Sequence, residues 1–312
     1  MAPIVVPGSA HPALASALAA ELGCELAACR LGRFPDGERD VEIEVPLRAE
    51  PVFLVQPLGS PVGEHLLELL LLADACRRAG GGPVTAVVPY VGLARQDRVT
   101  TEGRPLGAKV LADALGVGGF SQVIAVDLHS PVVASWSRAP VAHLTAVPAV
   151  AAALAPIVRE DSIVVAPDLG AVKLAEAYAR VLRLPLAVVS KSRVSPVEVT
   201  VRSVVGDVRG KRPIVVDDMI STGSTVEAAV SAVLEQGARP EIAVAATHGV
   251  FGEGLGGRLD RPEILRVAVT DGLPPAARSP ARLEVVRLAP LLAEAVRRLI
   301  GGRGLDELLA SG

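Results

Sequence analysis

Short runs of apolar, β-branched residues alternate along this chain with longer segments in which apolar residues recur every three or four positions. The first pattern is typical of buried strands and the second of amphipathic helices. Strands are predicted at residues 52–56, 84–89, 122–126, 162–166, 186–190, 213–216, 241–247 and 264–270. Helices are predicted at residues 12–22, 64–78, 107–115, 147–158, 172–182, 225–236 and 290–300. This alternation is typical of βαβ units and indicates an α/β fold with mainly parallel sheets flanked by helices.

The composition agrees with such a fold. The chain has 312 residues, which is enough for about two domains. Half of the residues are apolar but only 2% are aromatic, so the core must consist mainly of Ala, Val, Leu and Ile, as in a buried parallel sheet. The proline-rich segment 140–148 is the best candidate for a boundary. We therefore expect two similar-sized domains, at residues 1–145 and 146–312.

Charge and hydropathy exclude several classes of protein. The net charge of −3 gives no electrostatic case for nucleic acid binding. The longest uncharged run, residues 139–158, contains three prolines, so we expect a loop and a helix that Pro148 helps to start, rather than a membrane span. No signal peptide is expected at the N-terminus. Cys24, Cys29 and Cys76 cannot all pair and are not spaced for a metal, which favours reduced thiols and a cytoplasmic location.

The strongest motif lies at residues 215–229, where an apolar strand ends in Asp217 and Asp218 and is followed by a small-residue loop and a helix. The loop consists of Ser221, Thr222, Gly223, Ser224 and Thr225. Its hydroxyls and the N–H groups at the helix start can bind a phosphate, and Gly223 permits close backbone approach. The two carboxylates would repel a phosphate unless they bind sugar hydroxyls or a metal ion. A sugar phosphate is therefore the expected ligand, and the alternative is a helix cap beside two solvated acids.

Residues 34–43 form a second candidate segment. Phe34, Asp36 and Glu38 occupy alternate positions, so they lie on one side of the chain if it is extended. An aromatic ring with two acids could hold a nucleobase. The alternative, which spacing alone favours, is a hairpin turn built on Asp36 and Gly37.

A third segment follows the strand predicted at residues 84–89 and contains Arg95, Gln96, Asp97 and Arg98. Two arginines with a polar neighbour suit a polyphosphate, because guanidinium groups bind phosphate oxygens in pairs. A salt-bridged surface loop is an equally good interpretation.

Three further clusters follow predicted strands. Asp127 and His129 stand two residues apart, and either could contact Mg²⁺ or a phosphate. Asp168 precedes a helix and could serve a metal or cap the helix, and capping is the simpler interpretation. Lys191 and Arg193 lie on the same side of an extended chain and could neutralise charge on a transferring phosphoryl group, although a solvated basic loop is the usual reading.

Taken together and in this order, these segments resemble the ribose-phosphate pyrophosphokinase family, also called phosphoribosyl-pyrophosphate synthetases. The resemblance runs nearly end to end and includes residues 103–109, 246–251 and 269–274. It implies two type I phosphoribosyltransferase-like domains, the first with ATP-binding segments and the second with the ribose-5-phosphate and catalytic loops. It also implies transfer of the β,γ-diphosphoryl group of Mg-ATP to the C1 hydroxyl of ribose 5-phosphate, in a cytoplasmic homo-oligomer whose ATP site lies near a subunit interface.

The resemblance also assigns residue roles. The catalytic pair is Lys191 and Arg193, and the Mg²⁺–ATP residues are His129 and Asp168. ATP binding is implied for Phe34, Asp36, Gly37, Glu38, Arg95, Gln96 and Asp97. Ribose 5-phosphate binding is implied for Arg193, Asp217, Asp218, Ser221, Thr222, Gly223, Ser224 and Thr225, and a second Mg²⁺ at the acid pair remains open.

The chain departs from the common pattern of the family in two places. In the ribose-5-phosphate loop, many members carry an acid where Ser221 stands, and Ser224 replaces a smaller residue. The serine at 221 resembles the archaeal-type branch, as does the Lys-x-Arg-x-Ser pattern at residues 191–195. Residues 130–136 lack the Gln- and Phe-rich run common in bacterial and animal enzymes, which leaves the oligomer and regulation by ADP and phosphate open. The alternative functions are a phosphoribosyltransferase and a non-catalytic binding paralogue.

Overall fold

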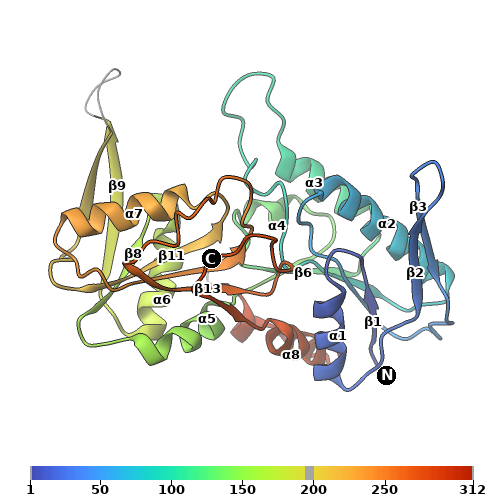
Figure 1. Ribbon diagram of the computed structural model, residues 1–312. Helices are drawn as coiled ribbons and strands as arrows, with labels where there is room; N and C mark the ends of the chain where they lie inside the picture. Colours follow the sequence, from blue (N-terminus) through green and yellow to red (C-terminus); the bar gives the residue numbers. More distant parts are fainter. Residues whose placement is uncertain (1, 194–199, 311–312) are drawn as a thin grey trace. The chain divides into compact units, whose positions relative to one another are not determined.

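The computed structural model describes residues 2–193 and 200–310, without the side chains of residues 191–202. The described chain forms two compact units (Figure 1). The first contains residues 2–145, 272–274 and 287–310, and the second contains residues 146–271 and 275–286. The change from one unit to the other after Thr145 falls inside the proline-rich segment 140–148.

A five-stranded parallel sheet forms the centre of the first unit. Its order is β1-β4-β5-β6-β7, with all neighbouring strands parallel. The strands are β1 (Ile4–Pro7), β4 (Val52–Val55), β5 (Val84–Val87), β6 (Gln122–Val126) and β7 (Val141–Leu144), and the helices are α1 (Pro12–Leu22), α2 (Val62–Arg78), α3 (Gly107–Val117), α4 (Val132–Trp136) and α8 (Ala289–Ile300). Two short strands, β2 (Cys29–Arg33) and β3 (Arg39–Ile43), form a separate antiparallel hairpin.

Helix α8 belongs to the first unit, although the sequence places it beyond the boundary in the second domain. It packs beside α1, and Arg297 donates a hydrogen bond to the backbone oxygen of Glu21 at the end of that helix. The apolar face of α8 is fully buried at Leu292 and Val296. The helix returns to the first unit because α1 offers an apolar face for it to cover.

The second unit is built on a seven-stranded sheet in the order β10-β9-β8-β11-β12-β13-β14. Its strands are β8 (Ser162–Ala166), β9 (Leu186–Arg193), β10 (Thr200–Val205), β11 (Arg212–Ile220), β12 (Ile242–Gly249), β13 (Ile264–Thr270) and β14 (Leu283–Val286). Among the described strands of this sheet, only the β9–β10 pair is antiparallel. Helix α7 (Ser224–Glu235) packs on β9, β10 and β11. Helix α6 (Val172–Leu182) packs on β8, β9 and β11, and α5 (Val147–Leu154) packs on α6 and on β12, β13 and β14.

The two cores confirm the composition argument. Strands β4, β5, β8 and β12 are buried along their length, and the buried apolar residues are mostly Val, Ala, Leu and Ile. All three cysteines are free thiols. In the described part of the chain, no helix combines the length and the apolar character that a bilayer crossing would require.

Several sequence-predicted elements needed correction. The expected loop before Pro148 contains strand β7, and the helix predicted at 147–158 ends at Leu154 and continues as the 3₁₀ turn η1 (Ala155–Ile157). Strands β1, β2, β3, β10 and β14 and helix α4 were not predicted. These elements have only four to six residues, so they hold too few positions for a clear periodic pattern.

Candidate functional site

In the second unit, the candidate ligand-binding residues gather at one edge of the parallel sheet. Strand β11 runs through Asp217 and Asp218, and its parallel neighbour β8 ends two residues before Asp168. Strand β9, parallel to β8, carries Lys191 and Arg193 at its carboxyl end. Since the carboxyl ends of parallel strands share one edge, these residues come together where open α/β sheets bind ligands.

The acid pair is electrostatically unusual. Asp217 accepts a hydrogen bond from the backbone N–H of Asp218 through Oδ1, at 2.9 Å. Burial raises the pKa of Asp217 well above its ordinary value, and the negative charges of Asp218 and Asp168 raise it further. The site therefore favours cations or hydroxyl donors at these oxygens.

The small-residue loop turns directly into helix α7. Gly223 precedes the helix with φ +76°, in the left-handed region that glycine adopts at low cost. The hydroxyls of Thr222 and Ser224 lie 3.1 Å apart, and both side chains are exposed. The first N–H groups of α7 lack intrahelical partners, so backbone and hydroxyl donors converge where an anion is favoured.

A second loop, which carries Leu255 and Arg258, holds this turn in place. The sequence analysis did not predict this loop. Arg258 donates a hydrogen bond to the backbone oxygen of Thr222 at 3.0 Å and forms an ion pair with Glu227 on α7 at 3.0 Å. A Cβ at Gly223 would lie 3.2 Å from a methyl carbon of Leu255 in the same loop. No local motif marks Arg258, because its role depends on a contact 36 residues away.

Asp168 serves as a cap. Its Oδ1 accepts hydrogen bonds from the backbone N–H groups of Gly170 and Ala171, at 2.9 and 3.3 Å, at the start of the 3₁₀ turn η2 (Leu169–Ala171). The capping interpretation is therefore confirmed, and the charge of Asp168 still acts on Asp217. The side chains of Lys191 and Arg193 lie outside what the structure describes.

In the first unit, the segments with Arg95 and His129 follow neighbouring strands, β5 and β6. Asp127 is buried, with a positive φ of 39°, and this strained turn leads to the exposed His129. The backbone N–H of Leu128 donates to Nε2 of His143 on β7 at 2.7 Å, which fixes the turn from the next strand. Sequence reasoning did not single out His143.

Arg95 and Gln96 are exposed, and Asp97 is partly buried. The backbone oxygen of Gln96 accepts a hydrogen bond from the N–H of Ala108 at 3.1 Å. A Cβ at Gly107 would lie 2.6 Å from Oε1 of Gln96. The segment is thus held against the start of α3. Asp97 and Arg98 form a wide ion pair of 3.8 Å, as a surface loop would allow.

The segment with Phe34 is the turn of the β2–β3 hairpin, as the alternative interpretation predicted, and not an extended chain. The N–H of Phe34 donates to the oxygen of Glu38 at 2.9 Å, Gly37 has φ +93°, and Asp36 accepts from the N–H of Glu38 at 3.1 Å. Phe34 is 49% exposed at the hairpin tip. A large apolar ring so exposed is available for contact with a ligand or another chain.

Comparison with known proteins identifies the family. Residues 4–119 match the model of the N-terminal domain of ribose phosphate pyrophosphokinase, and residues 141–258 match the phosphoribosyl transferase domain. The ribose-phosphate pyrophosphokinase of Aquifex aeolicus is 39% identical over 97% of this chain and 98% of its own. The enzyme of the same name from Caldanaerobacter subterraneus subsp. tengcongensis is 38% identical over 96% of each chain.

A solved structure agrees over the whole length. The phosphoribosylpyrophosphate synthetase from Mycobacterium smegmatis is 34% identical, covers 97% of this chain and 100% of its own, and superposes with a TM-score of 0.87. The matches cover both units, so neither half alone accounts for them. The chain therefore belongs to the ribose-phosphate pyrophosphokinase family of transferases.

Proposed function

We propose that this enzyme transfers the β,γ-diphosphoryl group of Mg-ATP to the C1 hydroxyl of ribose 5-phosphate, giving 5-phospho-α-D-ribose 1-diphosphate and AMP for nucleotide biosynthesis. The observation that carries the proposal is the hydroxyl-rich turn into α7, next to the carboxylates of Asp217 and Asp218. A phosphate on the turn and a diol on the carboxylates describe a pentose phosphate.

The protein's part in this reaction is positioning and charge neutralisation. The C1 hydroxyl oxygen bonds to the β-phosphorus, the bond from that phosphorus to the bridging oxygen of AMP breaks, and the hydroxyl proton is released. The loop from Ser221 to Thr225 holds the 5-phosphate, and Arg258 keeps this loop in place. Asp217 and Asp218 orient the ribose hydroxyls for in-line attack.

The binding of the adenine and phosphates of ATP is assigned to residues of the first unit. Arg95, Gln96 and Asp97 orient the phosphates, and the hairpin tip with Phe34, Asp36, Gly37 and Glu38 accommodates the adenine. An exposed aromatic ring on a hairpin tip suits a contribution to the site of a neighbouring subunit, which supports a homo-oligomer. Nucleic acid and membrane are not expected partners, and ATP use with free thiols supports a cytoplasmic location.

The donor atoms available fit a magnesium ion. Within the described residues, no group of three His, Cys, Asp or Glu side chains is placed to hold a metal by itself. This agrees with Mg²⁺, which commonly binds one or two protein carboxylates together with substrate phosphates. His129 and Asp168 would hold Mg²⁺–ATP, and the acid pair could take a second ion. When bound, Mg²⁺ neutralises charge on the phosphate oxygens.

One assay tests the proposal directly. Purified protein with Mg²⁺, ATP and ribose 5-phosphate should release AMP, and the release should require the sugar phosphate. ADP in place of AMP would indicate an ordinary kinase. Absence of ribose-dependent turnover would favour the non-catalytic paralogue.

Lys191→Ala tests the catalytic pair. We expect kcat to fall by about 10²-fold or more, with little change in KM for either substrate, because the ammonium group would act on charge that develops only in the transition state. Lys211→Ala, on the same unit but away from the motifs, serves as the control. Turnover of Lys191→Ala at the level of the unmodified enzyme would refute the assignment.

A further inference from the structure

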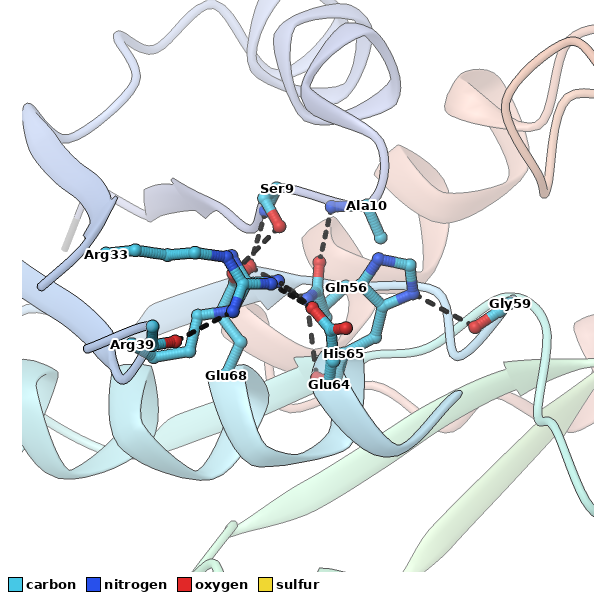
Figure 2. A network of polar contacts seen from close by, with 10 residues as sticks. Ser9, Ala10, Arg33, Arg39, Gln56, Gly59, Glu64, His65 and Glu68 are labelled. Atoms are coloured by element: carbon cyan, nitrogen blue, oxygen red, sulfur yellow. Dashed lines mark hydrogen bonds and ion pairs between the residues drawn. The ribbon is translucent and has the colours of Figure 1, made fainter. Parts of the chain in front are cut away.

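A buried carboxylate in the first unit is tied to the hairpin that carries the proposed adenine-binding tip. Glu68, on helix α2, is 0% exposed. Its Oε1 accepts hydrogen bonds from the N–H of Ser9 at 2.7 Å and from Gln56 at 2.9 Å. Its Oε2 accepts from the hydroxyl of Ser9 at 2.8 Å and pairs with Arg39 of β3 at 2.9 Å. Figure 2 shows these groups converging on α2.

The carboxylate is fixed to the central sheet on its other side. Ser9 follows β1 and Gln56 follows β4, two adjacent parallel strands. Gln56 also accepts from the N–H of Ala10 at 3.0 Å, and a Cβ at Gly8 would lie only 2.2 Å from Gln56 Oε1. Glycine at position 8 is thus what leaves room for the glutamine. Contacts with residues that follow β1 and β4 therefore hold the Glu68 carboxylate in place, and from this position it pairs with the hairpin.

The hairpin contacts the carboxylates of helix α2 through two arginines. Arg33 and Arg39 are register partners, the last pair before the turn at residues 34–38. Arg39 pairs with Glu68 and, at 3.2 Å, with Glu64, one helical turn earlier on α2. Arg33 pairs with the same Glu64 and donates to the oxygen of Gly37 at 2.9 Å. Like charges directly opposite on a hairpin repel, so the helix carboxylates are needed at this place.

The tip depends on this contact because the turn itself is not packed against the core. The hairpin is a separate two-stranded sheet, an arrangement of marginal stability on its own. Its apolar residues Leu31, Val41 and Ile43 pack on the core. Residues 34–38 of the turn are all exposed.

We propose that Glu68 and Arg39 are positioning residues for nucleotide binding: through a largely buried ion pair they set the place of the hairpin tip that contacts ATP. Neither residue touches the substrate. The inference rests on the proposed role of the tip, so it concerns the affinity for ATP and leaves the transfer step and the ribose 5-phosphate site unaffected.

Arg39→Met in the full-length enzyme tests it. We expect KM for ATP to rise about tenfold, while kcat and KM for ribose 5-phosphate stay within about twofold, because the lost contact acts only on ATP binding. Arg39→Lys, which restores one charge to Glu68, should recover part of the affinity. The matched control is Arg30→Met on β2, whose carboxylate partners are Asp40 and Glu42 of the hairpin itself. It should leave all three constants within about twofold.

Hydrogen exchange supplies an independent readout. In Arg39→Met the amides of residues 29–43 should exchange faster, while those of β4 and β5 are unchanged. An unchanged KM for ATP overturns the proposal, and so does an equal loss in kcat and both KM values, which indicates a structural role only. If Arg39→Met does not fold, Arg33→Met, at a more exposed side chain, is judged by the same criteria.

A second variant separates this inference from the proposed function. Phe34→Ala removes the ring from the tip and should itself raise KM for ATP. If it does so and Arg39→Met does not, only the positioning role is wrong. If Phe34→Ala has no effect on KM for ATP, the proposed role of the tip falls, and the positioning role falls with it.

Discussion

Replacing Asp217 with asparagine is expected to make the metal-free protein more stable and the enzyme less active. Asp217 carries a charge that burial and its neighbour Asp218 both oppose. Asparagine keeps an oxygen that can accept the 2.9 Å hydrogen bond from the N–H of Asp218, and it removes the charge. If Asp217 orients the ribose hydroxyls, the same change removes a strong acceptor, and kcat/KM for ribose 5-phosphate should fall about 10²-fold.

The size of the gain follows from the charges. Two unit charges about 5 Å apart repel by about 3 kcal/mol at an effective dielectric constant of about 20. Part of Asp217 remains in contact with water, and the amide must still be desolvated, so we expect a net gain of about 1–2 kcal/mol. At about 3 °C per kcal/mol for a unit of this size, Tm should rise by about 3–6 °C.

The raised pKa of Asp217 predicts how the stability gain of Asp217→Asn changes with pH. In the unfolded chain Asp217 titrates near its ordinary pKa of about 3.9, and in the folded protein its pKa is higher. Below the unfolded value both states are protonated and the charge costs nothing. As the pH rises from the unfolded pKa through the folded pKa, the folded state of the unmodified protein loses stability relative to Asp217→Asn. The gain in Tm should therefore be small at pH 4 and larger at pH 8.

Differential scanning calorimetry in buffer with EDTA measures this gain at both pH values. Asp161→Asn is the matched control with the opposite sign. Burial acts to raise the pKa of Asp161, but the hydrogen bond from Arg212 and the charges of Arg212 and Arg239 outweigh it and hold that pKa below its ordinary value. Asp161→Asn should thus lower Tm at pH 8. A fall in Tm for Asp217→Asn at pH 8, or an equal gain at pH 4, would refute the reasoning.

Two further predictions concern a glycine and a thiol. Gly223→Ala should destabilise the protein by about 1–2 kcal/mol, because residue 223 has a left-handed backbone, and should raise KM for ribose 5-phosphate but not for ATP. Gly210→Ala, with φ +68° and open space around it, should be destabilised without a change in KM. Equal KM values for ribose 5-phosphate in the two variants would contradict the loop assignment. Burial raises the pKa of Cys76 to about 12, so its thiolate fraction at pH 8 is about 10⁻⁴, and iodoacetamide should label it in urea but not in the folded protein. Mass spectrometry should find Cys24 labelled faster, and equal rates would contradict the burial of Cys76.

Local pattern predicted the regular elements well where it was long enough. Helices α1 and α6 match the predicted residues at both ends, and α7 differs by one residue at each end. Each contains eleven or twelve residues with a recurring buried face. Strand β7 is different: its four residues lie in an uncharged, proline-rich run that gives no alternation to read. Its pairing with β6, not its own sequence, makes it a strand.

The residues of the candidate site also differ in whether the sequence alone could identify them. Asp217, Asp218 and the turn at 221–225 lie within nine residues of sequence, so the strand, the acid pair and the glycine turn could be predicted without a structure. Arg258 could not, because nothing near it in sequence indicates the loop that it braces. For the turn at residues 34–38, the sequence was partly sufficient. The Asp36-Gly37 pair predicts a hairpin turn, but it does not predict the contacts of the hairpin with helix α2.

The sequence by itself determined the order of most strands and helices, the composition of the core and the motifs, because each depends on neighbours a few residues apart. Only the tertiary structure decided that α8 returns to the first unit and that Glu68 is buried at the root of the hairpin. Glu68 occupies an ordinary position in a helix with several acidic residues. Its burial follows from partners at Ser9, Arg39 and Gln56, which chain folding brings together, and a buried carboxylate is tolerated only where such partners meet.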